Sequence, residues 1–416
     1  MNIFDKIKPH KKVAENYFFL TFLRIANILI SLLLYPYLIR VLGKEAYGTY
    51  IFIFSNIQFF SIFVSFGFDY PALKKISLFP DDNEIKSQTV SEVFTAKICM
   101  FILCAVVLAL LIFAIPFVQK NTIFYIVIFT ILLIDILFPV WYFQGIQKLK
   151  ILTYVNLVSR ILTIPLVFIF IKSPADLLKF TLIVTFLPLA GSFFAFFYLQ
   201  IKEKIKIHFV KLIDLKPVFK DAIPFFWTSA FATLKTETVT LIIGKFFSMS
   251  DVALYDLANK IVNIPRMITN SINSVLFPKV VKNYNLESVK KIIKYETFIG
   301  LFIVGFIAAI GYWAVLILGG KEMLAAYPLA VILSFTIYAW LIVGCYINFL
   351  FIPQEKYYFV TKNQFAALLS FLIFTAIGLL ISKNIIVLVA AYTLSHFVEI
   401  IYCRYLIKKH RLLSSR

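Results

Sequence analysis

The chain has 416 residues, of which 61% are hydrophobic and 15% are charged, and its formal net charge is +20. Soluble domains contain about 45–50% apolar and about 25% charged residues, so this composition excludes an ordinary soluble globular domain. The basic residues are scattered over separate short segments and form no single patch, which argues against nucleic acid as a partner.

Apolar segments long enough to cross a bilayer follow one another along the whole chain, and each predicts a membrane-spanning helix. We therefore expect an all-α integral membrane protein with twelve transmembrane helices. The first six spans cover residues 17–38, 47–68, 94–117, 122–143, 152–171 and 177–199. The second six cover residues 223–244, 252–277, 298–318, 324–347, 365–381 and 385–406.

The distribution of lysine and arginine predicts the orientation of these spans. With the N-terminus placed on the cytoplasmic side, most of the 41 basic residues fall in cytoplasmic segments, as the positive-inside rule requires. We therefore expect a multi-pass protein with both termini in the cytoplasm.

Weak internal repeats predict two halves. "LGKEAYGTY" (42–50) aligns with "FSMSDVALY" (247–255), and "GIQKLK" (145–150) aligns with "PQEKYY" (353–358). We expect an N-terminal six-helix bundle over residues 1–200, a cytoplasmic amphipathic linker over 201–222 and a C-terminal six-helix bundle over 223–416. Because six is even, both halves share one orientation, which predicts a pseudo-two-fold axis along the membrane normal and a central cavity between the halves.

The seventh span carries charges near its middle, at Lys235 and Glu237. A charge at the bilayer centre costs about 2.5–3.5 kcal/mol on insertion scales, so such residues usually mark a functional site. The two side chains point about 160° apart on a helix, which predicts a different partner for each.

The eighth span has a polar stripe whose members are spaced alternately three and four residues apart. The members are Asp256, Asn259, Asn263, Arg266, Asn270 and Asn273, with Lys260 beside them. They share one helix face, and amide side chains cannot face lipid without partners. The stripe therefore faces either a wet cavity or a polar helix interface.

Other spans carry shorter polar faces, with Arg24 and Asn27 on the first, Gln58 on the second and Arg160 on the fifth. These faces fit either the same cavity or ordinary hydrogen bonding between helices, and the two arginines could also reach the cytoplasmic surface. A cavity rich in arginine, lysine and asparagine suits an anionic, hydroxyl-rich ligand.

Two intramembrane acids, Asp135 and Glu399, could be counter-ions or proton sites, and the sequence does not decide between these roles. The four cysteines lack the spacing of a zinc site, and His396 has no evident catalytic partner. We expect no catalytic site, no metal and no cofactor.

Three stretches resemble a known family. "WYFQGIQKLKILTYVNLVSR" (141–160) is similar to the junction of the fourth and fifth helices in bacterial Wzx-type O-antigen and polysaccharide repeat-unit flippases. "RVLGKEAYGTY" (40–50) resembles their first outer loop, and "FIPQEKYYFVTKN" (351–363) resembles its counterpart in the second half. These proteins form the polysaccharide transporter branch of the multidrug/oligosaccharidyl-lipid/polysaccharide exporter superfamily.

The resemblance implies a flippase in the bacterial inner membrane that moves a polyprenyl-diphosphate-linked oligosaccharide from the cytoplasmic to the outer leaflet. It also implies a cavity lined by helices one, two, seven and eight. The residues that the resemblance assigns to the substrate site are Arg24, Asn27, Arg160, Lys235, Lys260 and Arg266. We expect Glu237 to neutralise Lys235 in the empty cavity. Membrane lipid, a polysaccharide polymerase and chain-length proteins are the further expected partners.

Three alternatives stay open. A cation-coupled multidrug exporter of the same fold would need acid-rich cavity helices. A polysaccharide polymerase or another membrane enzyme would need a long outer loop or a catalytic pair of carboxylates. A membrane scaffold would not need a polar stripe that contains an arginine.

Overall fold

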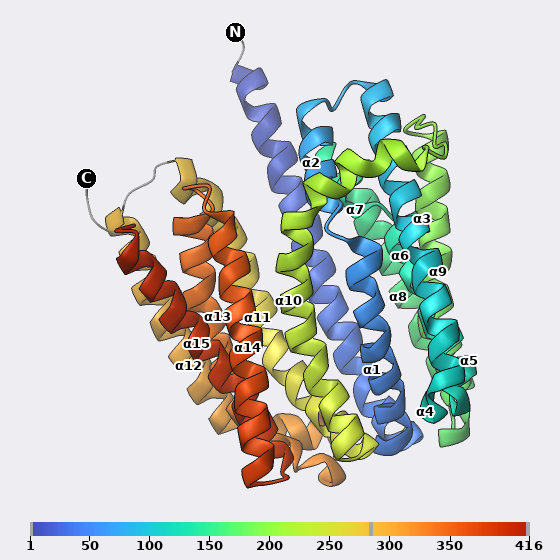
Figure 1. Ribbon diagram of the computed structural model, residues 1–416, viewed down its shortest axis with the longest axis vertical. Helices are drawn as coiled ribbons and strands as arrows, with labels where there is room; N and C mark the ends of the chain where they lie inside the picture. Colours follow the sequence, from blue (N-terminus) through green and yellow to red (C-terminus); the bar gives the residue numbers. More distant parts are fainter. Residues whose placement is uncertain (1–2, 283–285, 413–416) are drawn as a thin grey trace. The chain divides into compact units, whose positions relative to one another are not determined.

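The computed structural model describes the backbone of residues 3–282 and 286–412 (Figure 1). Its described side chains are those outside residues 1–21, 24–25, 270–286 and 413–416. Regular secondary structure in these ranges consists of helices, which confirms the predicted all-α fold class.

The first half of the chain contains nine α-helices. They are α1 (Ile3–Ser65), α2 (Asp69–Leu78), α3 (Asn83–Ala114), α4 (Pro116–Lys120), α5 (Thr122–Phe129), α6 (Leu132–Leu137), α7 (Val140–Gly145), α8 (Leu149–Phe170) and α9 (Leu177–Ile201), with a short 3₁₀ turn at Pro174–Asp176. Helix α1 covers the first two predicted spans and is broken at Gly43, where φ is +76°. That backbone conformation is open to glycine at little cost, so Gly43 marks the turn between the two spans.

The second half contains six α-helices. They are α10 (Lys216–Phe246), α11 (Met249–Lys282), α12 (Leu286–Gly319), α13 (Ala326–Tyr346), α14 (Tyr357–Ile381) and α15 (Ile385–Lys409), with 3₁₀ turns at Leu212–Leu215 and Lys321–Met323 and a π-turn at Ile347–Phe351. Helices α10 and α11 correspond to the seventh and eighth predicted spans, which carry Lys235 and the polar stripe.

Nine of the described helical segments are long and apolar enough to cross a membrane. One of them, Ala26–Ser65, runs through the Gly43 break and therefore holds parts of two predicted spans. The nine leave out α10 and α11, the helices that carry the central charges. The protein is a multi-pass membrane protein, and the number of twelve spans stays a prediction.

Large apolar side chains are exposed on many of these helices, which agrees with contact to lipid. Phe113 on α3 is 83% exposed, and Leu380 on α14 is 88% exposed. A soluble protein rarely exposes such residues in contiguous patches.

The chain divides into two compact units. The first comprises Met1–Leu34 and Ile53–Ser229, and the second comprises Tyr35–Phe52 and Ala230–Arg416. Helices α11 to α15 of the second unit lie side by side in Figure 1. Part of α1 packs closely within this unit, because an added Cβ on Gly48 would lie 1.8 Å from the carbonyl oxygen of Met249 on α11.

Residues 206–210 of the predicted linker are extended and lie along α3 in the first unit. Alternate backbone N–H groups donate to hydroxyl groups spaced four residues apart on that helix. The three bonds are Lys206 to Ser87 at 3.2 Å, His208 to Ser91 at 3.1 Å and Val210 to Thr95 at 3.1 Å. Two residues of strand rise about 6.6 Å and four residues of helix about 6.0 Å, so the two periods match.

The two halves share an unusual local conformation at corresponding places. Of the five described non-glycine residues with positive φ, four form two matched pairs, Gln147 (58°) with Glu355 (57°) and Lys204 (56°) with Arg411 (50°). The residue after each of the first pair donates to a carbonyl five positions back, Lys148 to Phe143 at 2.9 Å and Lys356 to Phe351 at 2.8 Å. This agreement supports the internal duplication predicted from "GIQKLK" and "PQEKYY".

Candidate functional site

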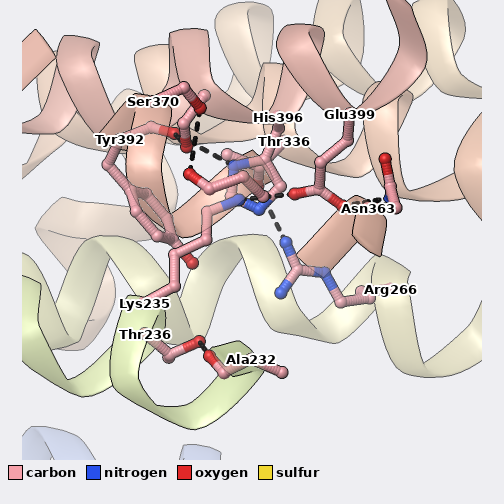
Figure 2. A network of polar contacts seen from close by, with 12 residues as sticks. Ala232, Lys235, Thr236, Arg266, Thr336, Asn363, Ser370, Tyr392, His396 and Glu399 are labelled. Carbon is pink, nitrogen blue, oxygen red and sulfur yellow. Dashed lines mark hydrogen bonds and ion pairs between the residues drawn. The ribbon is translucent and has the colours of Figure 1, made fainter. Parts of the chain in front are cut away.

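Lys235 on α10 is 3% exposed and lies in a polar network of the second unit (Figure 2). Its ammonium nitrogen is 2.5 Å from Oε1 of Glu399, a residue of α15 that is also buried. The side-chain amide of Asn363 on α14 donates to the other Glu399 oxygen at 3.4 Å. A buried charge is stable only when it is paired and hydrogen-bonded, and Glu399 supplies this partner for Lys235.

The predicted counter-ion for Lys235 is therefore corrected. Glu237 lies two residues further along the same helix, and side chains at that spacing point away from each other. It is half-buried and interacts electrostatically with Tyr255 and Tyr392, whereas Glu399 binds Lys235. The expectation that Glu237 neutralises Lys235 is wrong. Of the two roles left open for Glu399, the structure shows that of a counter-ion.

Arg266 on α11 points into the same network (Figure 2). Its guanidinium donates to Thr336 Oγ1 on α13 at 2.8 Å and to Asn263 Oδ1 at 3.1 Å. Its Nε atom is buried and has no hydrogen-bond partner among the described residues. Arginine presents five donors in a planar fork, so this side chain retains capacity to bind an anion.

Aromatic side chains of α15 complete this region. The Lys235 ammonium lies 5.5 Å from the ring centroid of Tyr392, within cation–π range. Nδ1 of His396 lies 3.0 Å from the Tyr392 carbonyl oxygen, one turn earlier on the same helix. We call Lys235, Arg266, Asn363, Tyr392 and Glu399 the central network.

A second cluster surrounds Lys260, which is less buried. Its ammonium binds the Asp256 carboxylate one turn earlier on α11 and the Tyr47 hydroxyl at 3.1 Å. It also lies 5.0 Å from the ring centroid of Tyr35, and the Tyr47 hydroxyl donates to Asp256 at 3.2 Å. Lys260 and Asp256, both predicted site residues, therefore neutralise each other in this conformation.

The predicted stripe of α11 is the accessible face of that helix. Asp256, Asn259, Asn263 and Arg266 are all partly exposed, whereas Leu257 and Ala258 on the other face are fully buried. The side chain of Asn270 lies outside the described residues. The described part of the polar stripe is therefore not completely buried between the helices of the second unit.

The predicted site residues of the first unit are more dispersed. Asn27 and Gln58 on α1 are half-buried, and Asn27 Oδ1 is buried without a hydrogen-bond partner in the described structure. Arg160 on α8 is exposed, and the side chain of Arg24 lies outside the described set. Convergence of these residues with Lys235 and Arg266 on one cavity stays a prediction.

The sequence analysis missed Lys97, which lies near the margin of the third predicted span. The structure pairs it with Asp135, so Asp135 also has the counter-ion role that the sequence left open. Asn363, Thr336 and Tyr392 were missed as well, because a single Asn, Thr or Tyr in an apolar helix carries no distinctive pattern.

The fold resembles two groups of solved transporters. The lipid II flippase MurJ in an inward closed conformation matches 95% of this chain and 87% of its own, with a TM-score of 0.72 and 16% identity. An inward-facing multidrug resistance transporter of the MATE family, in the MOP superfamily, matches 95% of this chain and 100% of its own, with a TM-score of 0.68 and 13% identity. These similarities show that the chain has the fold of these transporters.

The sequence comparisons identify the family. The family described as "Polysaccharide biosynthesis protein" matches residues 13–284, and the chain belongs to it. An Escherichia coli (strain K12) protein named "Putative O-antigen transporter" is 25% identical over 281 residues, which is 68% of each chain. The resemblance to O-antigen and polysaccharide repeat-unit transporters that the sequence motifs predicted is thereby confirmed.

Proposed function

We propose that the protein is a flippase that translocates a polyprenyl-diphosphate-linked oligosaccharide from the cytoplasmic to the outer leaflet of the bacterial inner membrane. Membership in the polysaccharide biosynthesis family and the O-antigen transporter name of its relative support the sugar part of this proposal. The fold shared with a lipid II flippase supports the lipid-linked part.

The observation that carries the proposal is the charge balance of the central network. Two cations, the buried Lys235 and the partly exposed Arg266, lie near the Glu399 carboxylate, which is bound to Lys235. The second cation and the buried, unpartnered Nε of Arg266 favour binding of an anion. A diphosphate supplies negative charge and several acceptor oxygens, including an acceptor for the unpartnered Nε of Arg266.

Glu399 then acts as an internal substitute for the diphosphate. Without substrate it holds the Lys235 ammonium, so the buried lysine never loses its counter-ion. An arriving diphosphate competes with Glu399 for Lys235 and engages Arg266. The amides of Asn259 and Asn263 on the accessible face of α11 provide donors and acceptors for sugar hydroxyls. Alternating access moves the bound headgroup to the other side of the membrane.

The multidrug exporter remains the rival function, because transporters of that class share the fold. Export of cationic drugs needs carboxylates that are free to bind the drug. In the described part of the second unit, Asp256 and Glu399 are each already bound to a lysine. This pairing favours the anionic substrate over the cationic one.

The first experiment measures binding to the purified full-length protein, with a short-chain polyprenyl diphosphate as the probe. Lys235→Ala and Arg266→Ala should each weaken binding at least tenfold, because truncating one side of a buried charge pair costs about 2–5 kcal/mol. Glu399→Gln should strengthen it, because the competing carboxylate is lost. Lys245→Ala is the matched control, since Lys245 is exposed on the same helix.

Cells that carry the same variants provide the second experiment. Loss of surface polysaccharide, with accumulation of the lipid-linked intermediate and normal protein levels, is the expected result for Lys235→Ala and Arg266→Ala. Wild-type binding of the diphosphate and wild-type surface polymer in both variants would overturn the proposal. Drug sensitivity without a polysaccharide defect would favour the multidrug exporter.

A further inference from the structure

A second buried lysine, Lys97 on α3, lies in the first unit and takes no part in the central network. Only 1% of its side chain is exposed. Its ammonium nitrogen is 2.7 Å from Asp69 Oδ1 and 3.0 Å from Asp135 Oδ2. It also donates to the backbone carbonyl of Asp135 at 3.2 Å. The ammonium is thus hydrogen-bonded to Asp135 and within ion-pair distance of Asp69.

A break in the predicted fourth span explains the bond to the Asp135 carbonyl. In a continuous helix the Asp135 carbonyl would accept from the N–H of residue 139, but that residue is proline and has no N–H. Helix α6 accordingly ends at Leu137, before Pro139 and the start of α7. Lys97 satisfies the carbonyl that the proline leaves unpaired, so its position follows from the local sequence of α6.

The cluster has a surplus of negative charge, since one ammonium faces two carboxylates. The side chains packed around it from α7, α9 and the linker are Trp141, Phe196, Leu199 and Ile207, and none of them titrates near neutral pH. Within the described structure, the charges acting on Lys97 are those of Asp69 and Asp135. One further monovalent cation would make the cluster neutral.

The carboxylates, unlike the lysine, are open to exchange. The Asp69 side chain is 35% exposed and the Asp135 side chain is 42% exposed, so both reach from the buried ammonium to the surface. Asp69 begins α2, outside the spans. Burial, together with the neighbouring Asp135 carboxylate, raises the pKa of Asp69 above its ordinary value, against the opposing effect of Lys97.

We propose that Asp69, Lys97 and Asp135 form a proton-binding site in which Asp69 takes up one exchangeable proton while Asp135 stays paired with Lys97. Hydronium delivers the proton to an Asp69 carboxylate oxygen and leaves as water, while Lys97 stays an ammonium ion and keeps Asp135. Proton uptake makes the cluster neutral and exchanges one ion pair of Lys97 for a weaker hydrogen bond. No other bond is made or broken.

The location of Asp69 gives this proton a structural consequence. Asp69 lies two residues after Gly67, and Phe66 and Gly67 have φ angles of +44° and +77°, so α1 ends at this break. Lys97 ties the first residue of α2 to α3 and α6. Protonation of Asp69 weakens this tie at a point where the backbone already turns. Protonation of the site therefore weakens the ion pair that attaches the N-terminal end of α2 to α3.

Infrared spectroscopy of the purified full-length protein over a series of pH values tests the proposal without any substrate. A protonated carboxyl gives a carbonyl band that a carboxylate lacks. The wild-type protein should show such a band at a pH well above about 3.9, the ordinary pKa of aspartate. Asp69→Asn and Asp135→Asn, which keep side-chain shape, should each remove it, and the exposed Asp81→Asn should leave it unchanged.

Lys97→Met provides the second arm, because an opposite charge beside a carboxyl lowers its pKa by about 1–3 units. Loss of the ammonium should move the midpoint of the band upward by at least one pH unit, whereas Lys97→Arg should retain the wild-type midpoint more closely. Identical spectra for the wild type, Asp69→Asn and Asp135→Asn would overturn the site. This readout does not depend on flipping, so the proposed function could fail while the proton site stands.

Discussion

Lys97 and Lys235 are two buried lysines on long helices, one in each unit, and their surroundings are opposite in charge. Lys97 faces two carboxylates that are partly exposed. Lys235 is bound to one carboxylate, which is itself buried, and has Arg266 as a neighbouring cation. The first cluster has two carboxylates for one cation, whereas the second has two cations beside the Glu399 carboxylate.

The comparison shows that the residue type does not decide the ligand class of a buried ionic cluster. The number of counter-charges and their access to water decide it. Two partly exposed carboxylates beside one cation favour a proton, whereas two cations with an unpartnered guanidinium nitrogen favour a multivalent anion. Breaking an ion pair should also destabilise the protein more when the paired groups are more deeply buried. This predicts an order of effects for the pairs of Lys235, Lys97 and Lys260.

The largest effect is expected at the Lys235–Glu399 pair. Glu399→Leu alone leaves a buried ammonium without a counter-charge and should destabilise the protein by about 3–5 kcal/mol. Lys235→Met combined with Glu399→Leu removes both charges and should restore most of this loss. Chemical unfolding in detergent measures both. If the double variant is no more stable than Glu399→Leu, the pairing is not what stabilises this region.

A double variant that folds normally also separates stability from function. It lacks the cation that the proposed diphosphate site requires, so it should be stable yet inactive in producing surface polysaccharide. Full activity in this variant would remove Lys235 from the transport mechanism while leaving its structural role intact.

An intermediate effect is expected at Lys97. Lys97→Met leaves two carboxylates facing each other and an unpaired Asp135 carbonyl, at a cost of about 1–3 kcal/mol. Solvent access to both carboxylates keeps this cost below that at Glu399. Unfolding at several pH values measures it.

The pH dependence of this loss has a definite sign. The pKa of Asp69 is already raised in the folded protein, and removing Lys97 raises it further. A group whose folded pKa exceeds its unfolded pKa gains stability as the pH falls. The deficit of Lys97→Met should therefore shrink on acidification through the raised pKa of Asp69, and Asp69→Asn in the same chain should abolish this pH dependence.

The smallest effect is expected at Lys260, whose side chain is 31% exposed. Its pair with Asp256 is partly open to water and is helped by the rings of Tyr35 and Tyr47. Lys260→Met should cost less than about 1 kcal/mol. A loss as large as that at Glu399 would show that exposure does not set the order of the three lysines.

The sequence predicted those features of the fold and site that depend on local pattern. The spacing of Asn259, Asn263 and Arg266 predicted that they share one face of α11, and this face is partly exposed. Lys235 and Glu237 point in opposite directions on a helix, which predicted a different partner for each. The repeated motif at residues 145–150 and 353–358 reappears as the same positive-φ turn at Gln147 and Glu355. Helix periodicity and turn chemistry are properties of neighbouring residues, so a single sequence reveals them.

Features that depend on tertiary packing escaped the sequence. Glu399 lies far along the chain from Lys235, and only the packing of α15 brings the two together. Lys97 was overlooked because a lysine near the end of a span usually reaches the membrane surface. Its burial follows from the proline break in α6, which creates an acceptor that no hydropathy pattern reports.

The hydroxyl ladder of Ser87, Ser91 and Thr95 has a consequence for how the connection between the halves tolerates change. Because alternate amides of residues 206–210 are bound, one residue inserted within this segment would turn every later amide away from its hydroxyl. Two inserted residues would preserve the alternation. Residues 206–210 should therefore tolerate insertion of an even number of residues but not of an odd number. Any added length is best accommodated after Val210.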